Sequence, residues 1–153
     1  MTVRYAALFF FIALAGYNCA RPETTNSTMT TADDMSQANL TLTAKQRSAE
    51  QRLPENMRSP EKYKFVEVTV TSVENPGKHS VSFEVYYVAP NNERIFFGTF
   101  SLFPADNPGR FIVPTQGKLK GGGKLILTLV LPPEVRDTDP IKVTAREMKL
   151  REE

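Results

Sequence analysis

The sequence has very few of the residues that carry metal or thiol chemistry. Among its 153 residues it has one histidine, one cysteine and no tryptophan. A single histidine cannot supply a multi-histidine copper or zinc centre, and a single cysteine can form neither a CxxC redox pair nor a disulfide within the chain. We therefore expect no metal and no cofactor.

A large excess of one charge is also missing. Nineteen Lys and Arg side chains stand against seventeen Asp and Glu, which gives a net charge of +2. Proteins that bind nucleic acid usually concentrate basic residues on one face or along one helix. We therefore expect no nucleic-acid partner, and a length and composition of this kind predict one soluble, monomeric domain with appendages.

Residues 1–20 have the order of a secretory signal. Arg4 is followed by an apolar run from Tyr5 to Gly16 and then by small and polar residues. About twelve apolar residues span roughly 18 Å as a helix, which is short of the ~30 Å hydrocarbon core of a bilayer. We expect export of the mature protein, either to the cell envelope or to the medium.

Cys19 stands where a bacterial lipoprotein signal is cut and acylated. It precedes a Ser- and Thr-rich stretch, although Tyr17 and Asn18 depart from the small residues usual before such a cysteine. Two interpretations follow. Either Cys19 is the lipid attachment that tethers the protein to a membrane, or an ordinary signal is cut near Ala20 and Cys19 is lost with it.

Residues 21–62 are polar and low in large apolar side chains. Such a segment cannot bury enough apolar surface to offset its ordering entropy, so we expect a flexible tether. Thr43 has capping-box spacing to Gln46, which predicts at most a marginal helix of about two turns before Pro54.

From Tyr63 onward the apolar residues recur at every second position. Six such runs begin near residues 65, 80, 94, 110, 124 and 141, and Pro, Gly or Asn occupies nearly every gap. This alternation predicts strands with one buried face. We expect an all-β, antiparallel immunoglobulin-like β-sandwich of six to seven strands over residues 63–153 that folds alone. Gly98 indicates a bulge or a close approach of the backbone, with Phe96, Phe100 and Leu102 on the inner face around it.

Five residues are candidate surface contacts. By alternation, Tyr86 and Phe97 point away from the main inner face, and the run KLKGGGKL makes the most basic spot of the domain. The run is not a phosphate-binding P-loop, because it lacks GxxxxGK[ST] and precedes a strand; we expect a flexible loop. His79 lies in a turn without an acidic partner nearby, so we expect no catalytic residue. The candidate contacts are Tyr86, Phe97, Lys118, Lys120 and Lys124.

The strands, read in order, resemble the C-terminal β-sandwich that follows the catalytic domain of tyrosinases and polyphenol oxidases. The similar segments are VTVTSVENPGKHSVSFEVYYVAPNN, FFGTFSLF, RFIVPT, LILTLVLPP and IKVTAREMKL, over about residues 65 to 150. The resemblance implies a non-catalytic domain that covers a copper site and influences folding or activation. This chain has no dicopper domain, since one histidine cannot supply six ligands.

Two functions remain open. The first is a non-enzymatic, exported β-sandwich that acts through contact with a protein partner, as a cap or accessory to an oxidase or another envelope protein. The alternative is a module that binds carbohydrate or an anionic surface through Tyr86, Phe97 and the loop from Lys118 to Lys124.

Overall fold

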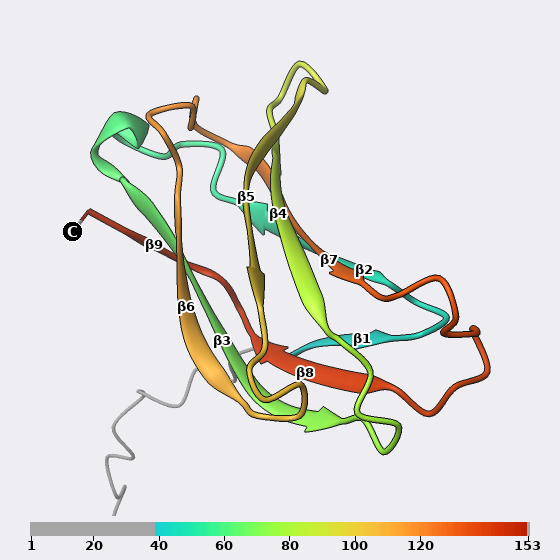
Figure 1. The fold of residues 1–153 in the computed structure, drawn as a ribbon. Coiled ribbons are helices and arrows are strands. Elements are labelled where there is room, and N and C mark those ends of the chain that lie inside the picture. Colours follow the sequence, from blue (N-terminus) through green and yellow to red (C-terminus); the bar gives the residue numbers. More distant parts are fainter. Residues whose placement is uncertain (1–38, 153) are drawn as a thin grey trace, which may run out of the picture. The chain divides into compact units, whose positions relative to one another are not determined.

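The computed structural model describes residues 39–152, which form two facing antiparallel β-sheets (Figure 1). A short 3-10 turn, η1 (Pro60–Lys62), precedes the third strand. The predicted signal segment, Cys19 and the first part of the predicted tether lie outside the described residues. The strands in this range are β1 (Asn39–Thr43), β2 (Ser48–Leu53), β3 (Phe65–Glu74), β4 (Ser82–Val88), β5 (Arg94–Ser101), β6 (Gly109–Pro114), β7 (Gly123–Val130), β8 (Lys142–Arg146) and β9 (Lys149–Arg151).

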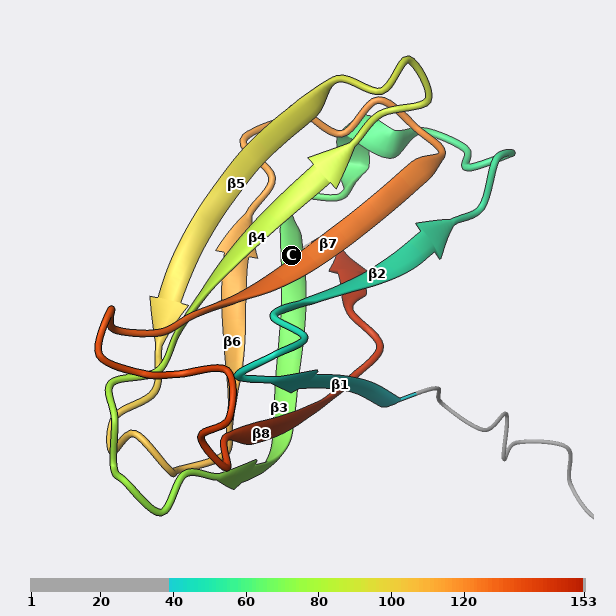
Figure 2. The ribbon, with the colours of Figure 1, turned by 90° about the vertical axis from the view of Figure 1, so that its right-hand side faces the viewer.

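One sheet has the strand order β1-β8-β3-β6, with β9 beside the first residues of β3, and the other has the order β2-β7-β4-β5. The chain passes from one sheet to the other at six of the eight connections between these strands, and the β4–β5 and β8–β9 connections stay within their sheets. Figure 2 shows β2, β7, β4 and β5 side by side in front of β3 and β6. The predicted antiparallel β-sandwich is confirmed, with more strands than the six to seven expected.

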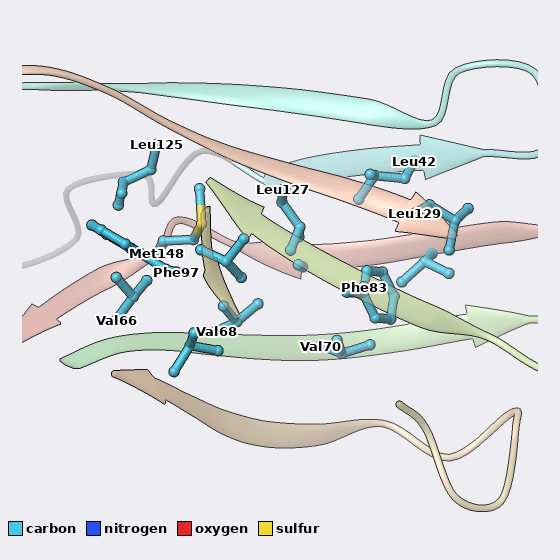
Figure 3. Close-up of a cluster of buried hydrophobic side chains, with 14 of the residues drawn as sticks. Leu42, Val66, Val68, Val70, Phe83, Phe97, Leu125, Leu127, Leu129 and Met148 are labelled. Atoms are coloured by element: carbon cyan, nitrogen blue, oxygen red, sulfur yellow. The ribbon is translucent and has the colours of Figure 1, made fainter. Parts of the chain in front are cut away.

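The core lies between the two sheets and is built by the alternation seen in the sequence. Val66, Val68 and Val70 of β3 are at most 2% exposed. They face Phe83 of β4 and the leucines of β7 (Figure 3). Burying a side chain of this size contributes about 1.5–3 kcal/mol, so the inner rows provide most of the favourable free energy of folding.

A β-bulge in β5 changes which aromatic residues are buried. Val85 of β4 pairs with Gly98, but the next residue, Tyr86, pairs with Phe96, so that Phe97 is the extra residue. Phe97 is 1% exposed and stacks on Tyr87, with ring centres 5.8 Å apart, whereas Phe96 is 46% exposed. The bulge at Gly98 is confirmed. The expected outward Phe97 and inward Phe96 are wrong, because the bulge exchanges the two faces of the strand before it.

The sequence predicted a flexible tether over residues 21–62, with at most a marginal helix after Thr43. That prediction is wrong for the second half of this segment. Residues 39–43 form β1 on the edge of one sheet, beside β8, and residues 48–53 form β2 on the edge of the other, beside β7. Leu42 is fully buried between the sheets. The segment is too polar to fold alone, and its few apolar side chains are ordered by the core that β7 and β8 supply. Among residues 39–152, no helix is long and apolar enough to cross a bilayer.

Candidate functional site

The solvent face of the sheet β2-β7-β4-β5 carries two neighbouring rows of side chains. Strand pairing sets the rows, because every second residue of each strand points to this face. We call them the aromatic row and the basic row. The aromatic row is Glu50, Ile126, Tyr86 and Phe96, and the basic row is Arg52, Lys124, Val88 and Arg94.

Tyr86 lies at the centre of this face, and its ring is covered. The Arg94 guanidinium carbon lies 3.8 Å from the Tyr86 ring centre, and the tilted Phe96 ring centre lies 5.4 Å away. The Tyr86 hydroxyl donates a 2.7 Å hydrogen bond to Oε2 of Glu84. That hydrogen bond is the main reason why the pKa of Tyr86 is raised. Tyr86 is therefore a half-buried side chain whose hydroxyl is bonded to Glu84 and one of whose ring faces is covered by Arg94.

Phe96 is the most exposed large apolar side chain of this face among the described residues, although alternation along the strand had predicted it in the core. Its neighbour Ile126 is 8% exposed, although Ile126 also points to the solvent side. Together with Tyr86 they form an apolar patch between charged neighbours. The signal that could have identified Phe96 is Gly98, since a bulge there reverses the alternation of the preceding residues.

The three candidate lysines differ in their surroundings. Lys120 Nζ lies 2.8 Å from Glu93, and this ion pair holds the pKa of Glu93 below its usual value. Lys124 Nζ contacts both carboxylate oxygens of Glu50, at 2.9 and 2.8 Å. Lys118 is exposed. Only Lys124 lies in the rows described above, so the lysines do not form one cluster.

The glycine loop at the start of β7, in the run from Lys118 to Lys124, is held in place by contacts with β4. This corrects the expectation of a flexible loop. The buried Tyr87 hydroxyl lies within hydrogen-bond distance of the carbonyl oxygens of Gly121 (3.1 Å) and Gly122 (2.7 Å). Gly123 has φ +101°, and a Cβ there would lie 2.2 Å from the Val88 carbonyl oxygen. Glycine is required because the loop passes against β4 at this point.

An open depression of about 530 Å³ adjoins the basic row. Arg52, Val88 and Lys124 of that row line it. Its remaining lining comes from the β4–β5 hairpin, the glycine loop and the residues after β2, namely Leu53, Glu55, Ala89, Pro90, Asn92, Gly122 and Gly123. The braced loop therefore forms one wall of a shallow site that continues into the solvent face of the sheet.

The other sequence candidates occupy structural positions. His79 is held in its turn by Asn75, whose amide nitrogen donates to the His79 carbonyl (2.8 Å) and whose Oδ1 accepts from the His79 backbone amide (3.1 Å). No group of three or more His, Cys, Asp or Glu side chains in the described range is placed to hold a metal ion. Phe103, on the loop after β5, is 94% exposed and is a second apolar contact that alternation did not identify.

Compared with known proteins, the sequence matches no family model and no curated protein.

Proposed function

We propose that this protein is a non-enzymatic, exported β-sandwich that binds a protein partner through the solvent face of the sheet β2-β7-β4-β5. The observation that carries the proposal is Phe96, which is 46% exposed beside Tyr86, with the Arg94 guanidinium over the Tyr86 ring. An exposed Phe and Arg beside a half-buried Tyr are typical of the centre of a protein–protein interface, where aromatic residues and Arg are enriched.

The covered ring of Tyr86 disfavours carbohydrate as the ligand. Sugar binding by aromatic residues requires a free, flat ring face for stacking. Arg94 occupies one face of Tyr86, and Phe96 meets it at 57° rather than lying in the same plane. Phe97, the other aromatic candidate for a sugar platform, is buried. A partner with its own apolar side chains can pack against this tilted pair.

The partner class that we propose is an exported protein, with an oxidase as the first candidate. The resemblance to the C-terminal β-sandwich of tyrosinases supports a cap or accessory role, and the β-sandwich fold agrees with it. The predicted signal segment supports a partner outside the cytosol, and an acylated Cys19 would place the contact at a membrane.

Site-specific photo-cross-linking in the native host tests the proposal. The full chain carries a benzophenone amino acid at position 96 or, as a matched control, at position 112. Ile112 is 51% exposed on β6 of the other sheet, so both positions accept the probe without loss of core packing. We expect one cross-linked protein from position 96 and none from position 112.

Phe96→Ala and Ile112→Ala extend the test to affinity for the captured protein. Loss of an interface anchor costs about 2 kcal/mol or more, which is roughly a 30-fold rise in Kd. We expect that rise for Phe96→Ala alone. Equal cross-linking at both positions, or glycan binding by the unmodified chain that Phe96→Ala leaves intact, would contradict the proposal.

A further inference from the structure

The basic row carries charge that the protein itself does not neutralise. Lys124 is paired with Glu50, but no carboxylate of the described residues lies within 4 Å of the guanidinium groups of Arg52 or Arg94. Both arginines are exposed residues on the same face of one sheet. At its two ends the row therefore has guanidinium groups without a carboxylate partner among the described residues, and that of Arg94 is stacked on the Tyr86 ring.

The spacing of these two arginines is set by the sheet. Arg52 pairs with Lys124, Lys124 with Val88, and Val88 with Arg94, so the two arginines are three strand spacings apart. At about 4.8 Å for each spacing, the Cα atoms of the two arginines are roughly 14 Å apart. An extended peptide rises about 3.4 Å per residue, so residues four apart lie the same distance from each other and on the same side of the peptide.

We propose that the basic row binds an extended acidic segment of the protein partner, with two carboxylates four residues apart on Arg52 and Arg94. The residue midway between the carboxylates points to the same side, between Lys124 and Val88, where an apolar side chain can pack against Val88. The depression beside Arg52, Lys124 and Val88 gives the part of the segment nearest Arg52 a place to lie. This inference rests on the proposed function and names the chemistry of the partner.

The alternation of charge favours a protein segment over an anionic bilayer. Carboxylates of Glu50 and Glu84 lie on this face, and that of Glu93 lies in the adjoining β4–β5 hairpin, each bonded to a neighbour. A bilayer presents a uniform negative surface that these carboxylates would repel, whereas a peptide places its charges only where an arginine is available. Two basic residues contribute only about 1 kcal/mol each at a membrane surface, which is too little for stable binding.

Peptide titration followed by fluorescence anisotropy tests the inference. The probe is a labelled, capped seven-residue peptide with two glutamates four positions apart, a valine midway and serines elsewhere. The control peptide has the same composition with adjacent glutamates. We expect the full chain to bind the probe at least fivefold more tightly than the control, and Arg52→Gln and Arg94→Gln each to weaken probe binding about fivefold or more, which is about 1 kcal/mol.

Arg110→Gln is the matched variant, since Arg110 is an exposed arginine on the solvent face of the other sheet. We expect it to leave probe binding unchanged. Equal binding of the two peptides, or equal effects of all three variants, would overturn the inference. So would binding to phosphatidylserine vesicles that depends on Arg52 and Arg94 while the peptide is not bound. Phe96-dependent capture of a protein without any peptide binding would leave the proposed function standing and refute this inference alone.

Discussion

At the scale of the residue, adjacent side chains in β5 have opposite roles. Phe97 is buried against Tyr87, while Phe96 lies on the solvent face. We expect Phe97→Ala to lower the free energy of unfolding by about 3–5 kcal/mol, because it leaves a cavity in the core. Phe96→Ala should change it by less than about 1 kcal/mol, since surface substitutions have small effects. Urea unfolding of the two variants checks the position of the bulge. A larger loss of unfolding free energy in Phe96→Ala than in Phe97→Ala would place the bulge elsewhere.

The hydroxyl of Tyr87 links stability to alkaline pH. Burial raises the pKa of Tyr87, so above its ordinary value of about 10 the unfolded chain releases the proton while the folded chain keeps it. The contribution of the protonated Tyr87 hydroxyl to the free energy of unfolding is complete below that pH. It is lost as the pH rises through the higher pKa of the folded state. Tyr87→Phe should cost about 1 kcal/mol near neutral pH, because the hydrogen bonds to the glycine loop are lost.

Unfolding measured at neutral pH and above about pH 10 separates the two effects of Tyr87→Phe. The variant should lose less stability than the unsubstituted protein on going to alkaline pH. An equal loss in both proteins would show that other groups control the alkaline dependence.

At the scale of the element, β1 and β2 complete the two sheets. Leu42 of β1 and Leu53 of β2 belong to the core, and Gln51 of β2 exchanges two hydrogen bonds, of 2.9 and 2.6 Å, with the backbone of Met148 near β9. We therefore expect a fragment of residues 39–153 to unfold cooperatively. A fragment of residues 63–153 should lose at least half of the unfolding free energy or fail to fold. This replaces the sequence-based expectation that the shorter fragment folds alone.

Circular dichroism and thermal unfolding of the two fragments check this expectation. A matched control is Gln51→Ala in the longer fragment, which should cost about 1–3 kcal/mol, since the backbone groups of Met148 lose their partners. Equal stability of the two fragments would mean that β1 and β2 are only attached to a sandwich that is complete without them.

The loop that carries Phe103 is held by its neighbours. Asn75, which is 4% exposed, donates to the carbonyl oxygens of His79 and Ala105, and Lys78 pairs with Asp106 across the two loops. That ion pair holds the pKa of Asp106 below its usual value. The exposed Phe103 therefore lies on a loop that these hydrogen bonds and this ion pair hold in place.

At the scale of the whole molecule, the surface charges add little to stability. Four of the seven ion pairs within residues 39–152 are exposed on both sides, and exposed pairs contribute about 0–1 kcal/mol each. We expect the free energy of unfolding to change by less than about 1 kcal/mol between low salt and about 0.5 M NaCl. Peptide binding at the basic row should weaken over the same range. Salt-sensitive unfolding would show that the ion pairs stabilise the fold more than their exposure suggests.

The alternation from Tyr63 onward was enough to predict the β class, the inner rows of β3, β4 and β7, and the bulge at Gly98. These features are local, because a strand with one buried face must alternate and a glycine inside a strand often marks a bulge. The rest depended on partners that are distant in the chain. Whether residues 39–53 are ordered was decided by the strands β7 and β8 beside them, and whether Phe96 or Phe97 is buried was decided by the register of β5 on β4. Only the tertiary structure brings Arg52, Lys124 and Arg94 into one row, because strand order, not sequence order, sets the neighbours across a sheet.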